Sequence, residues 1–394
     1  MVSVKRLASY LSLLLISFPY VGFIPNFDTQ PLFVLPLILL TFFTKFSIFS
    51  VLLFVSLAGI FLLGTLVNID KHSARSLVHF CALIAYFLIY INYEELKRFF
   101  TEKFFRVVIY VYLAVGCVQL LFVTDFLTFL TSRSKTEALL AFESGRGVVS
   151  LTAEPSHFGM TLLFLFLAYY LAVKIGSPKN KMHHIAGSHI AVLLASFLGV
   201  ILLSQSIYAI ALFTILAFYV LFTERKYYVL LFLVSCCIGV VLYVLSLTIA
   251  NLRILEMLQL LWLQPSLLLE QGAFARLMNI PRTLFGSYLF WPYGTGTSNP
   301  DAVYFTISTP IGDFYTSIRD RASGGLLEFV LIYGVFGLPI VLLFICVLLC
   351  LVFVNRSVLS VYLLLLLTIA GPVVQPILAA LVIVYVRSGL YRIK

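Results

Sequence analysis

The sequence SIFSVLLFVSLAGIFLLGTLV, residues 47–67, contains no charged side chain and is as long as a helix that crosses a lipid bilayer. The rest of the chain has the same character. Of its 394 residues, 62% are hydrophobic and only 11% are charged, and the mean hydropathy is +1.09. Soluble domains carry about 25% charged residues, and a single buried core stops growing at about 250–300 residues. The composition therefore predicts a membrane protein.

Further apolar runs predict further spans. Together with residues 47–67, they predict an all-α, polytopic integral membrane protein of eleven or twelve transmembrane helices, in a single transmembrane domain over residues 1–394. The expected spans cover about 7–24, 31–43, 47–67, 76–92, 106–123, 157–173, 186–203, 207–222, 227–248, 326–354, 358–371 and 376–386. The last two flank Gly371-Pro372, so residues 358–386 are predicted either as one kinked helix or as two short ones.

The basic residues predict the direction in which the chain crosses. The net charge is +10, from 26 Lys and Arg against 16 Asp and Glu. With the amino terminus inside, the cytoplasmic segments hold sixteen basic and four acidic residues, and the outer segments hold ten basic and twelve acidic ones. This asymmetry follows the positive-inside rule. Both termini are therefore expected in the cytoplasm, and the positive charge needs no nucleic-acid partner.

Two outer loops, residues 124–156 and 249–325, are much longer than the others. Long loops on a rigid scaffold commonly carry function. In the second loop, Leu252–Leu263 mixes polar residues among leucines, so short interfacial helices are expected there. Aromatic residues of the same loop could stack on sugar rings or form an aromatic belt at the membrane surface; they are Tyr288, Trp291, Tyr293, Tyr304 and Tyr315.

Arginine dominates the basic residues of the outer segments. It supplies seven of the sixteen basic residues inside but eight of the ten outside, which are Arg75, Arg133, Arg146, Arg253, Arg276, Arg282, Arg319 and Arg321. The planar guanidinium binds phosphate or carboxylate through two parallel hydrogen bonds. Individual arginines could instead extend to the lipid headgroups. As a set, they favour a polyanionic ligand on the outer face.

The first long loop ends in GRGVVSLTAEPSHFG, residues 145–159, which leads into the sixth span. Pro155 suits the first turn of a helix, and Glu154 is then expected at the helix N-terminus. Glu154, Arg146 and His157 thus meet at one membrane boundary, where ionisable groups are functional candidates. The alternative is a capped helix start with no further role.

This run resembles the Arg…Glu-Pro-Ser signature of Wzy-type polysaccharide polymerases, the O-antigen and capsule repeat-unit polymerases of bacteria. The chain departs from the family at Ile207, where an arginine often stands. Ser323 stands where the related O-antigen ligases have a histidine, and this difference favours a polymerase over a ligase. Further stretches are similar to the family in order and placement: Leu203-Ser204-Gln205-Ser206, Arg276 with Pro281 and Gly294-Thr295-Gly296, and Arg321-Ala322-Ser323-Gly324-Gly325 leading to Gly334-Val335-Phe336-Gly337.

The resemblance implies a metal-independent glycosyltransferase with a GT-C-like helical fold and no cofactor. It would lie in the bacterial inner membrane with its active site on the periplasmic face. Its substrate would be an oligosaccharide repeat carried on undecaprenyl pyrophosphate. The growing glycan would leave its lipid pyrophosphate and join a sugar hydroxyl of the next lipid-linked repeat. The expected partners are this substrate, the membrane lipids and, as a possibility, a chain-length regulator protein.

Each candidate site residue has an expected role in this reaction. Glu154 would be the general base or would orient the acceptor hydroxyl. Arg146 would contact the pyrophosphate, and His157 is a weaker catalytic candidate. Substrate-binding residues are expected at Arg133, Arg276, Arg282, Arg319, Arg321 and Ser206. Aspartates of the second loop could bind acceptor hydroxyls or neutralise arginines; they are Asp301, Asp313 and Asp320.

The remaining histidines do not predict a metal site. His183, His184 and His189 are expected in a solvated inside loop, and His79 and Glu328 as paired structural groups within the fourth and tenth spans. Two other functions stay open. An O-antigen ligase would move the finished glycan to a lipid A core, and a flippase for lipid-linked saccharide would have charges along a central path within its spans.

Overall fold

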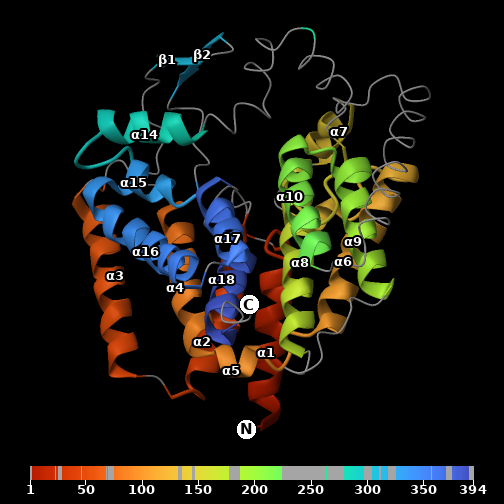
Figure 1. Ribbon diagram of the computed structural model, residues 1–394, viewed down its shortest axis with the longest axis horizontal. Helices are drawn as coiled ribbons and strands as arrows, with labels where there is room; N and C mark the ends of the chain where they lie inside the picture. Colours follow the sequence, from red (N-terminus) through yellow and green to blue (C-terminus); the bar gives the residue numbers. More distant parts are fainter. Residues whose placement is uncertain are drawn as a thin grey trace. The chain divides into compact units, whose positions relative to one another are not determined.

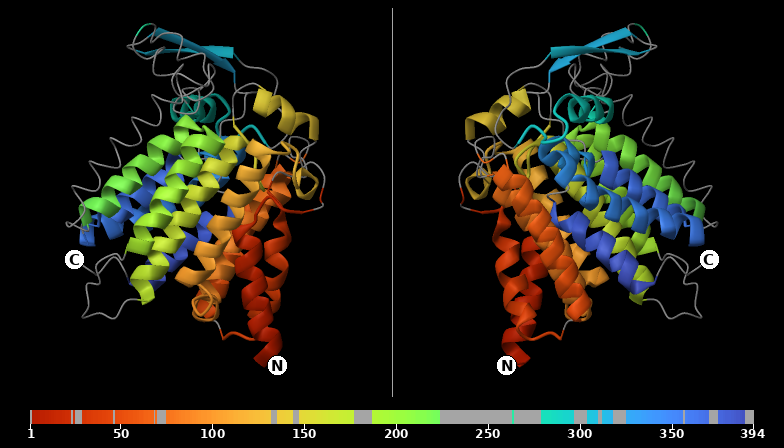
Figure 2. Two further views of the ribbon diagram at one scale, coloured as in Figure 1. Left: turned by 90° about the vertical axis from the view of Figure 1, so that its right-hand side faces the viewer. Right: turned by 90° about the vertical axis from the view of Figure 1, so that its left-hand side faces the viewer.

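A computed structural model describes residues 2–22, 24, 29–45, 47–67, 69, 75–131, 135–143, 147–176, 187–223, 263, 279–296, 304–309, 312–317, 325–355, 357–369 and 375–389. The chain divides into two compact units. Unit 1 comprises residues 1–101 and 269–394, and unit 2 comprises residues 102–268. Because the placement of one unit against the other is not determined, each is described by itself (Figures 1 and 2).

Unit 1 combines the two ends of the chain. Its amino-terminal elements are α1 (Val2–Ser17), η1 (Pro31–Phe33), α2 (Val34–Thr41), α3 (Ile48–Val67), α4 (Arg75–Ile91) and the short α5 (Tyr93–Leu96). Its carboxy-terminal elements are α14 (Asn279–Leu289), β1 (Tyr304–Thr309), β2 (Gly312–Ser317), α15 (Leu327–Tyr333), η7 (Gly334–Phe336), α16 (Leu338–Asn355), α17 (Val358–Ile369) and α18 (Pro376–Ser388). Helix α4 lies at the centre, where it packs against α2, α3 and α18.

Unit 2 is built around one buried helix. Its elements are α6 (Glu102–Leu121), η3 (Thr128–Leu130), α7 (Lys135–Glu143), α8 (Pro155–Gly176), α9 (Gly187–Leu198), the π-helix η4 (Gly199–Ser204) and α10 (Ile207–Thr223). Helix α8 packs against α6, α9, η4 and α10. Its side chains are apolar almost all round, as is typical of a buried helix, and 83% of the helix is buried inside the protein.

The described chain is helical, as predicted, apart from one antiparallel β-hairpin in the second long loop. In this hairpin β1 pairs with β2, with Tyr304 opposite Ser317 and Thr309 opposite Gly312. The expectation of a purely α-helical chain therefore fails at these twelve residues, where alternating Tyr, Phe, Ile and Thr favour extended backbone. The hairpin and α14 lie at the end of unit 1 opposite to α5 (Figure 1).

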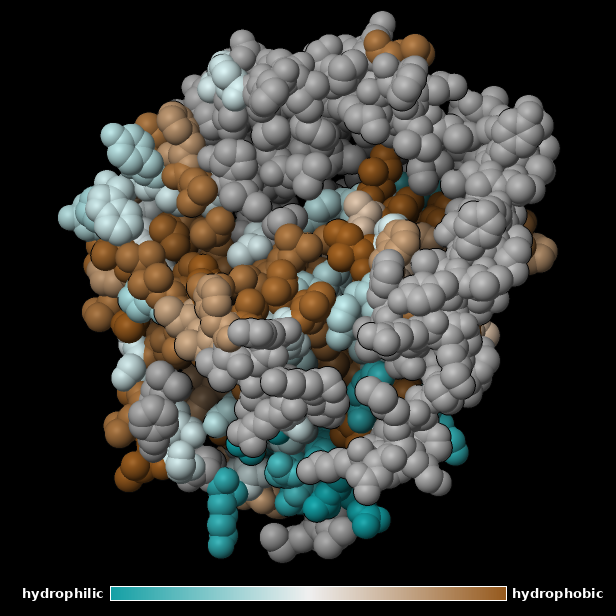
Figure 3. Space-filling view, in the orientation of Figure 1, coloured by the Kyte–Doolittle hydropathy of each residue, from teal (hydrophilic) through white to brown (hydrophobic). Residues whose placement is uncertain are grey.

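Three helices in the described part of the chain are long and apolar enough to cross a membrane: Ser50–Val67, Glu102–Leu121 and Pro155–Gly176. Eight shorter apolar helices accompany them. Apolar side chains also cover much of the visible surface of unit 1, over α3 and α16 (Figure 3). In α3 only 12% of the stretch Ser50–Val67 is buried. These features are compatible with a helical membrane protein.

Most predicted spans correspond to a described helix, and two differ in an informative way. The run 326–354 is interrupted, because Gly334 adopts a positive φ of 57° after α15 and a 3-10 turn precedes α16. The run 358–386 forms two helices, α17 and α18, and α18 begins with Pro376 in its first turn. The predicted span 227–248 lies outside the described residues.

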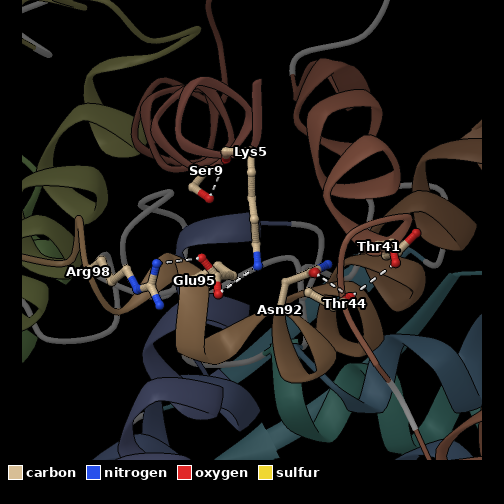
Figure 4. Close-up of polar contacts among 7 residues, drawn as sticks. All are labelled: Lys5, Ser9, Thr41, Thr44, Asn92, Glu95 and Arg98. Carbon is tan, nitrogen blue, oxygen red and sulfur yellow. Dashed lines mark hydrogen bonds and ion pairs between the residues drawn. The ribbon is translucent and has the colours of Figure 1, made fainter. Parts of the chain in front are cut away.

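Charged side chains gather at the α5 end of unit 1 (Figures 3 and 4). Lys5 of α1 pairs with Glu95 at 2.9 Å, and Arg98 pairs with the same carboxylate at 3.2 Å. Arg387 of α18 lies 4.0 Å from Glu94. The start of α1 and the end of α18 therefore meet at one end of the unit, beside the loop that follows α4, which agrees with the expected common side of both termini.

Buried Asn92 joins the helices at this end. Its amide donates to the carbonyls of Leu88 at 2.9 Å and Leu37 at 3.3 Å. Its carbonyl oxygen accepts from Thr44 Oγ1 at 3.0 Å (Figure 4). The side chain is fully buried. Since an unmet buried polar group costs about 1–3 kcal/mol, these bonds fix the position of α2 against the end of α4.

Candidate functional site

The structure places only some of the predicted site residues. Glu154, His157 and Ser206 are described, and all three belong to unit 2. Arg282 lies in the first turn of α14, where only its backbone is described. The other predicted contacts lie outside the described residues: Arg133, Arg146, Arg276, Arg319 and Arg321.

The end of the first long loop is buried rather than solvated. Val148, Val149, Ser150, Leu151, Thr152 and Ala153 are all buried. Ser150 Oγ donates to the carbonyl of Tyr112, which lies nine residues before the end of α6 and therefore about 13 Å along its axis. The segment thus re-enters the helical unit. Non-helical backbone at such a depth is stable only when protein covers it and pairs its polar groups.

One glutamine of α6 provides this pairing. Gln119 Nε2 donates to the carbonyls of Phe126 at 2.8 Å and Ser150 at 3.1 Å, and its Oε1 accepts from the Ser150 N–H at 2.6 Å. Ser150 has a positive φ of 52°. Gln119 therefore holds both sides of the first long loop and fixes a strained residue four positions before Glu154. This residue was not among the predicted candidates.

Two glycines of the GRGVVSLTAEPSHFG run bring it against the Ser204-Gln205-Ser206 turn. A Cβ on Gly147, whose φ is 84°, would lie 2.3 Å from the carbonyl oxygen of Leu203, and the Val148 N–H donates to that same oxygen at 2.8 Å. A Cβ on Gly159 would lie 2.6 Å from Ser204 Oγ. Two stretches that were singled out separately in the sequence are therefore in direct contact.

Glu154 lies immediately before α8, as predicted. Its backbone carbonyl accepts from the Phe158 N–H at 3.0 Å and from Thr152 Oγ1 at 2.9 Å. Its half-buried carboxylate accepts from Ser156 Oγ at 3.3 Å. The positive end of the α8 dipole favours the ionised carboxylate here. A carboxylate at this position is of the chemical type that can accept a proton from a hydroxyl.

The first turn of α8 packs against α6 more than one turn before the carboxy-terminal end of that helix. The ring of Phe158 stacks on Tyr112 with centroids 6.3 Å apart, and it lies beside Gly116. Gly116 precedes the end of α6 by five residues, or about 7 Å of helix. His157, half-buried, belongs to the same turn. Glu154 and His157 are therefore close to each other and recessed within the helical unit.

The turn between η4 and α10 gives Ser206 a structural role. Its Oγ accepts from the Ala209 N–H at 3.4 Å and so caps α10. Gln205, just before it, has a positive φ of 47°, and its Oε1 is buried without a hydrogen-bond partner. The π-helix ends at this residue, and π-bulges frequently occur at functional sites. Gln205 is therefore a further site candidate within the Leu203–Ser206 stretch, of which only Ser206 was predicted as a site residue.

His189 does not lie in a solvated loop. It is the third residue of α9, its side chain is 16% exposed, and its Nδ1 is hydrogen-bonded to Tyr169 of α8. The same nitrogen lies 3.9 Å from Glu102, which also pairs with Arg106. The apolar continuation of α9 beyond residue 189 brings the imidazole into the helical unit. His183 and His184 lie outside the described residues.

Unit 1 contains two further sequence candidates in structural roles. His79 Nδ1 is 3.1 Å from the hydroxyl of Tyr333, so His79 is a paired group as expected. The Gly294-Thr295-Gly296 turn binds the end of α15: the N–H groups of Thr295 and Gly296 donate to Leu331 at 2.8 Å and to Ile332 at 3.0 Å. Within the described residues, no group of three His, Cys, Asp or Glu side chains could hold a metal ion.

The resemblance to polysaccharide polymerases therefore depends on the quoted sequence motifs, of which residues 145–159 and 203–206 lie in unit 2 and the others in unit 1. No protein-family model, no curated protein and no solved structure matches this chain.

Proposed function

We propose that the chain is a polytopic membrane protein of about twelve spans in the bacterial inner membrane, with a GT-C-like fold and both termini in the cytoplasm. The exposed apolar sides of its helices support this location. The exposed residues of α3 alone include Ile48, Leu52, Val55, Leu62, Leu63 and Leu66. Soluble monomers rarely expose an apolar surface of this extent.

We further propose that it is a Wzy-type polymerase acting on a glycan carried by undecaprenyl pyrophosphate. The bond between the anomeric carbon and the pyrophosphate oxygen breaks, and the pyrophosphate leaves with the electron pair. A sugar hydroxyl of the next lipid-linked repeat forms the new bond to that carbon. Its proton passes to Glu154, and Arg146 neutralises the charge that develops on the leaving group.

One observation carries the proposal. The recessed Glu154 lies in a segment that two glycines, Gly147 and Gly159, press against the Ser204-Gln205-Ser206 turn. The residue before Gly147 in the sequence is Arg146. Burying a carboxylate in an apolar helical unit costs free energy, so ionisable groups at such positions usually have a function. Proton transfer from an acceptor hydroxyl supplies that function.

Polymer formation from a purified lipid-linked repeat tests this function. The full chain in phospholipid vesicles should extend the repeat into a ladder of glycans. Glu154→Gln should lower the rate by about 100-fold or more, as expected for loss of a general base. Glu143→Gln, an exposed acid of α7 in the same loop, is the matched control and should retain full activity. An active Glu154→Gln protein rules out the base.

The same assay separates the alternatives. Transfer of the glycan to a lipid A core, without extension of the lipid-linked repeat, identifies a ligase. Movement of the intact lipid-linked repeat across the vesicle membrane, without bond formation, identifies a flippase. Arg146→Ala should weaken binding of the pyrophosphate donor; unchanged donor affinity contradicts the assigned contact. A chain-length regulator partner would change the length distribution of the ladder and not its formation.

A further inference from the structure

Helix α14 has an inverted distribution of side chains. Thr283 and Gly286, which face the protein, are buried, and Ser287 and Phe290 on the same side are half-buried. The opposite side carries the large apolar residues Leu284, Phe285, Tyr288 and Leu289, which are between 42% and 77% exposed. Among the described side chains, the small and polar Thr283, Gly286 and Ser287 are inside, and four of the five large apolar residues are outside.

Water does not favour such a pattern. A helix that lies on the surface of a soluble protein turns its apolar side toward the core and its polar side toward water. The reverse distribution is stable where the medium outside is itself apolar. The exposed face of α14 therefore indicates contact with lipid, or with another apolar surface, rather than with solvent.

The orientation of α14 identifies which part of a bilayer it would meet. The helix lies across the ends of other helices of unit 1 and runs crosswise to α3 (Figures 1 and 2). It packs against α15 and α17. If α3 crosses the membrane, then α14 runs parallel to the membrane surface at its outer edge.

The turn after α14 carries the side chains that prefer this depth. Trp291 and Tyr293 are about half exposed, and both have an apolar ring with a polar handle. Trp and Tyr concentrate where the acyl chains meet the headgroups. The turn is fixed to unit 1, because the Pro292 carbonyl accepts from the Val335 N–H at 2.8 Å and the Gly294–Gly296 backbone binds α15.

We infer that α14 and the turn through Tyr293 form an interfacial anchor whose partner is the phospholipid surface of the outer leaflet. Its apolar face lies at the boundary of headgroups and acyl chains. Tyr288, Trp291 and Tyr293 therefore belong to an aromatic belt and do not form a sugar-stacking platform. The interfacial position rests on the proposed membrane localisation of the chain and is independent of the reaction that it catalyses.

Tryptophan fluorescence tests this position directly, because the chain contains only two tryptophans. Trp262→Phe leaves Trp291 as the sole indole in the full chain, and Trp262→Phe with Trp291→Phe gives the background. The protein is reconstituted in vesicles of phosphatidylethanolamine and phosphatidylglycerol that contain phosphatidylcholine brominated near the headgroup or near the chain ends. Bromine near the headgroup should reduce Trp291 emission at least twofold, and more than bromine near the chain ends. Acrylamide should quench it weakly.

A reference indole on α3 separates this inference from the proposed localisation. In the Trp-free background, Val55→Trp places an indole on the exposed side near the middle of α3, and deep bromine should quench it best. If Val55→Trp is quenched by lipid and Trp291 only by acrylamide, the aromatic face meets water and the interfacial anchor is wrong. If Trp291 is shielded from both quenchers, protein covers the face and the anchor is again wrong. If neither indole is quenched by lipid, the membrane localisation itself fails.

Discussion

At the scale of single residues, Gly147 is a position where the backbone leaves no room for a side chain. Its φ of 84° disfavours any residue with a Cβ, and that Cβ would lie 2.3 Å from the Leu203 carbonyl oxygen. The left-handed region costs a non-glycine residue about 1–2 kcal/mol before any clash. Gly147→Ala should therefore lower the free energy of unfolding by about 2 kcal/mol or more, measured by thermal unfolding of the purified protein.

Gly176→Ala is the control for this substitution. Gly176 ends α8, and a Cβ there would meet no atom within 4 Å. Alanine is a better helix former than glycine by about 1 kcal/mol, so this variant should be unchanged or slightly more stable. Equal melting temperatures for the two variants contradict the close approach of residue 147 to the Ser204 turn.

Gln119 offers a second prediction, because its amide satisfies two buried backbone groups of Ser150 in the re-entrant segment and the carbonyl of Phe126. Gln119→Leu keeps a similar volume but removes all three hydrogen bonds. The unmet Ser150 N–H alone should cost about 1–3 kcal/mol. We expect lower thermal stability and a loss of polymer formation, although Gln119 is not assigned any contact with substrate. Retention of both properties shows that the segment is held by other groups.

Substitution of Gln205 by glycine should stabilise the protein, whereas Gln119→Leu should destabilise it. Glycine adopts its positive φ without strain and removes the buried Oε1 that has no partner. Gln205→Gly should therefore raise the melting temperature, by an amount that corresponds to about 1 kcal/mol. If the amide serves the proposed reaction, polymer formation falls while stability rises, as is common at functional positions. A destabilised variant contradicts the assigned strain.

Sequence reasoning found part of the site at this scale. A proline beside a carboxylate predicted the start of α8 and the place of Glu154, because Pro fits the first helical turn irrespective of tertiary structure. Gln119 escaped notice, because its importance comes from a long-range contact that leaves no local pattern. Gln205 lies in a stretch that was quoted, but its backbone conformation could not be predicted from that stretch. Ser206 was predicted as a binding residue, and the geometry gives it a capping bond.

At the scale of elements, hydropathy predicted where helices occur better than where they break. The run 326–354 is apolar throughout its length, so its period and composition indicate one helix. The break at Gly334 depends on the Pro292 carbonyl, which is 42 residues away in the sequence and accepts from the Val335 N–H. The β-hairpin escaped prediction because its short strands lie in a loop that was read as interfacial helices.

Gly334→Ala tests this break. A Cβ on Gly334 would lie 1.9 Å from the Pro292 carbonyl oxygen, and its φ is positive. The substitution should push the Trp291–Gly296 turn away from α15 and make Trp291 more accessible to acrylamide in the single-tryptophan protein. Gly59→Ala on α3, where a Cβ meets nothing within 4 Å, should leave Trp291 unchanged. Equal quenching in both variants contradicts the contact.

At the scale of the whole molecule, charge predicted more than any single motif. The excess of basic residues in alternate loops implies that the loop after α4, the start of α1 and the end of α18 share one side. The ion pairs of Lys5, Glu94, Glu95 and Arg387 place those segments together in unit 1. The composition alone could not predict that these segments lie together, because it gives the number of charges and not their positions.

Cysteine labelling in spheroplasts tests the orientation that follows. The six native cysteines are first replaced by alanine, and single cysteines are then introduced at exposed positions: Lys97 after α5, Ser308 on β1 and Thr136 on α7. A membrane-impermeant maleimide should label Ser308→Cys and Thr136→Cys in intact spheroplasts, because both lie in segments predicted to be periplasmic. Lys97→Cys should react only after permeabilisation, because the basic segment around it faces the cytoplasm. Labelling of Lys97→Cys before permeabilisation, or protection of Ser308→Cys, would reverse the orientation and place Glu154 on the wrong side of the membrane for a periplasmic reaction.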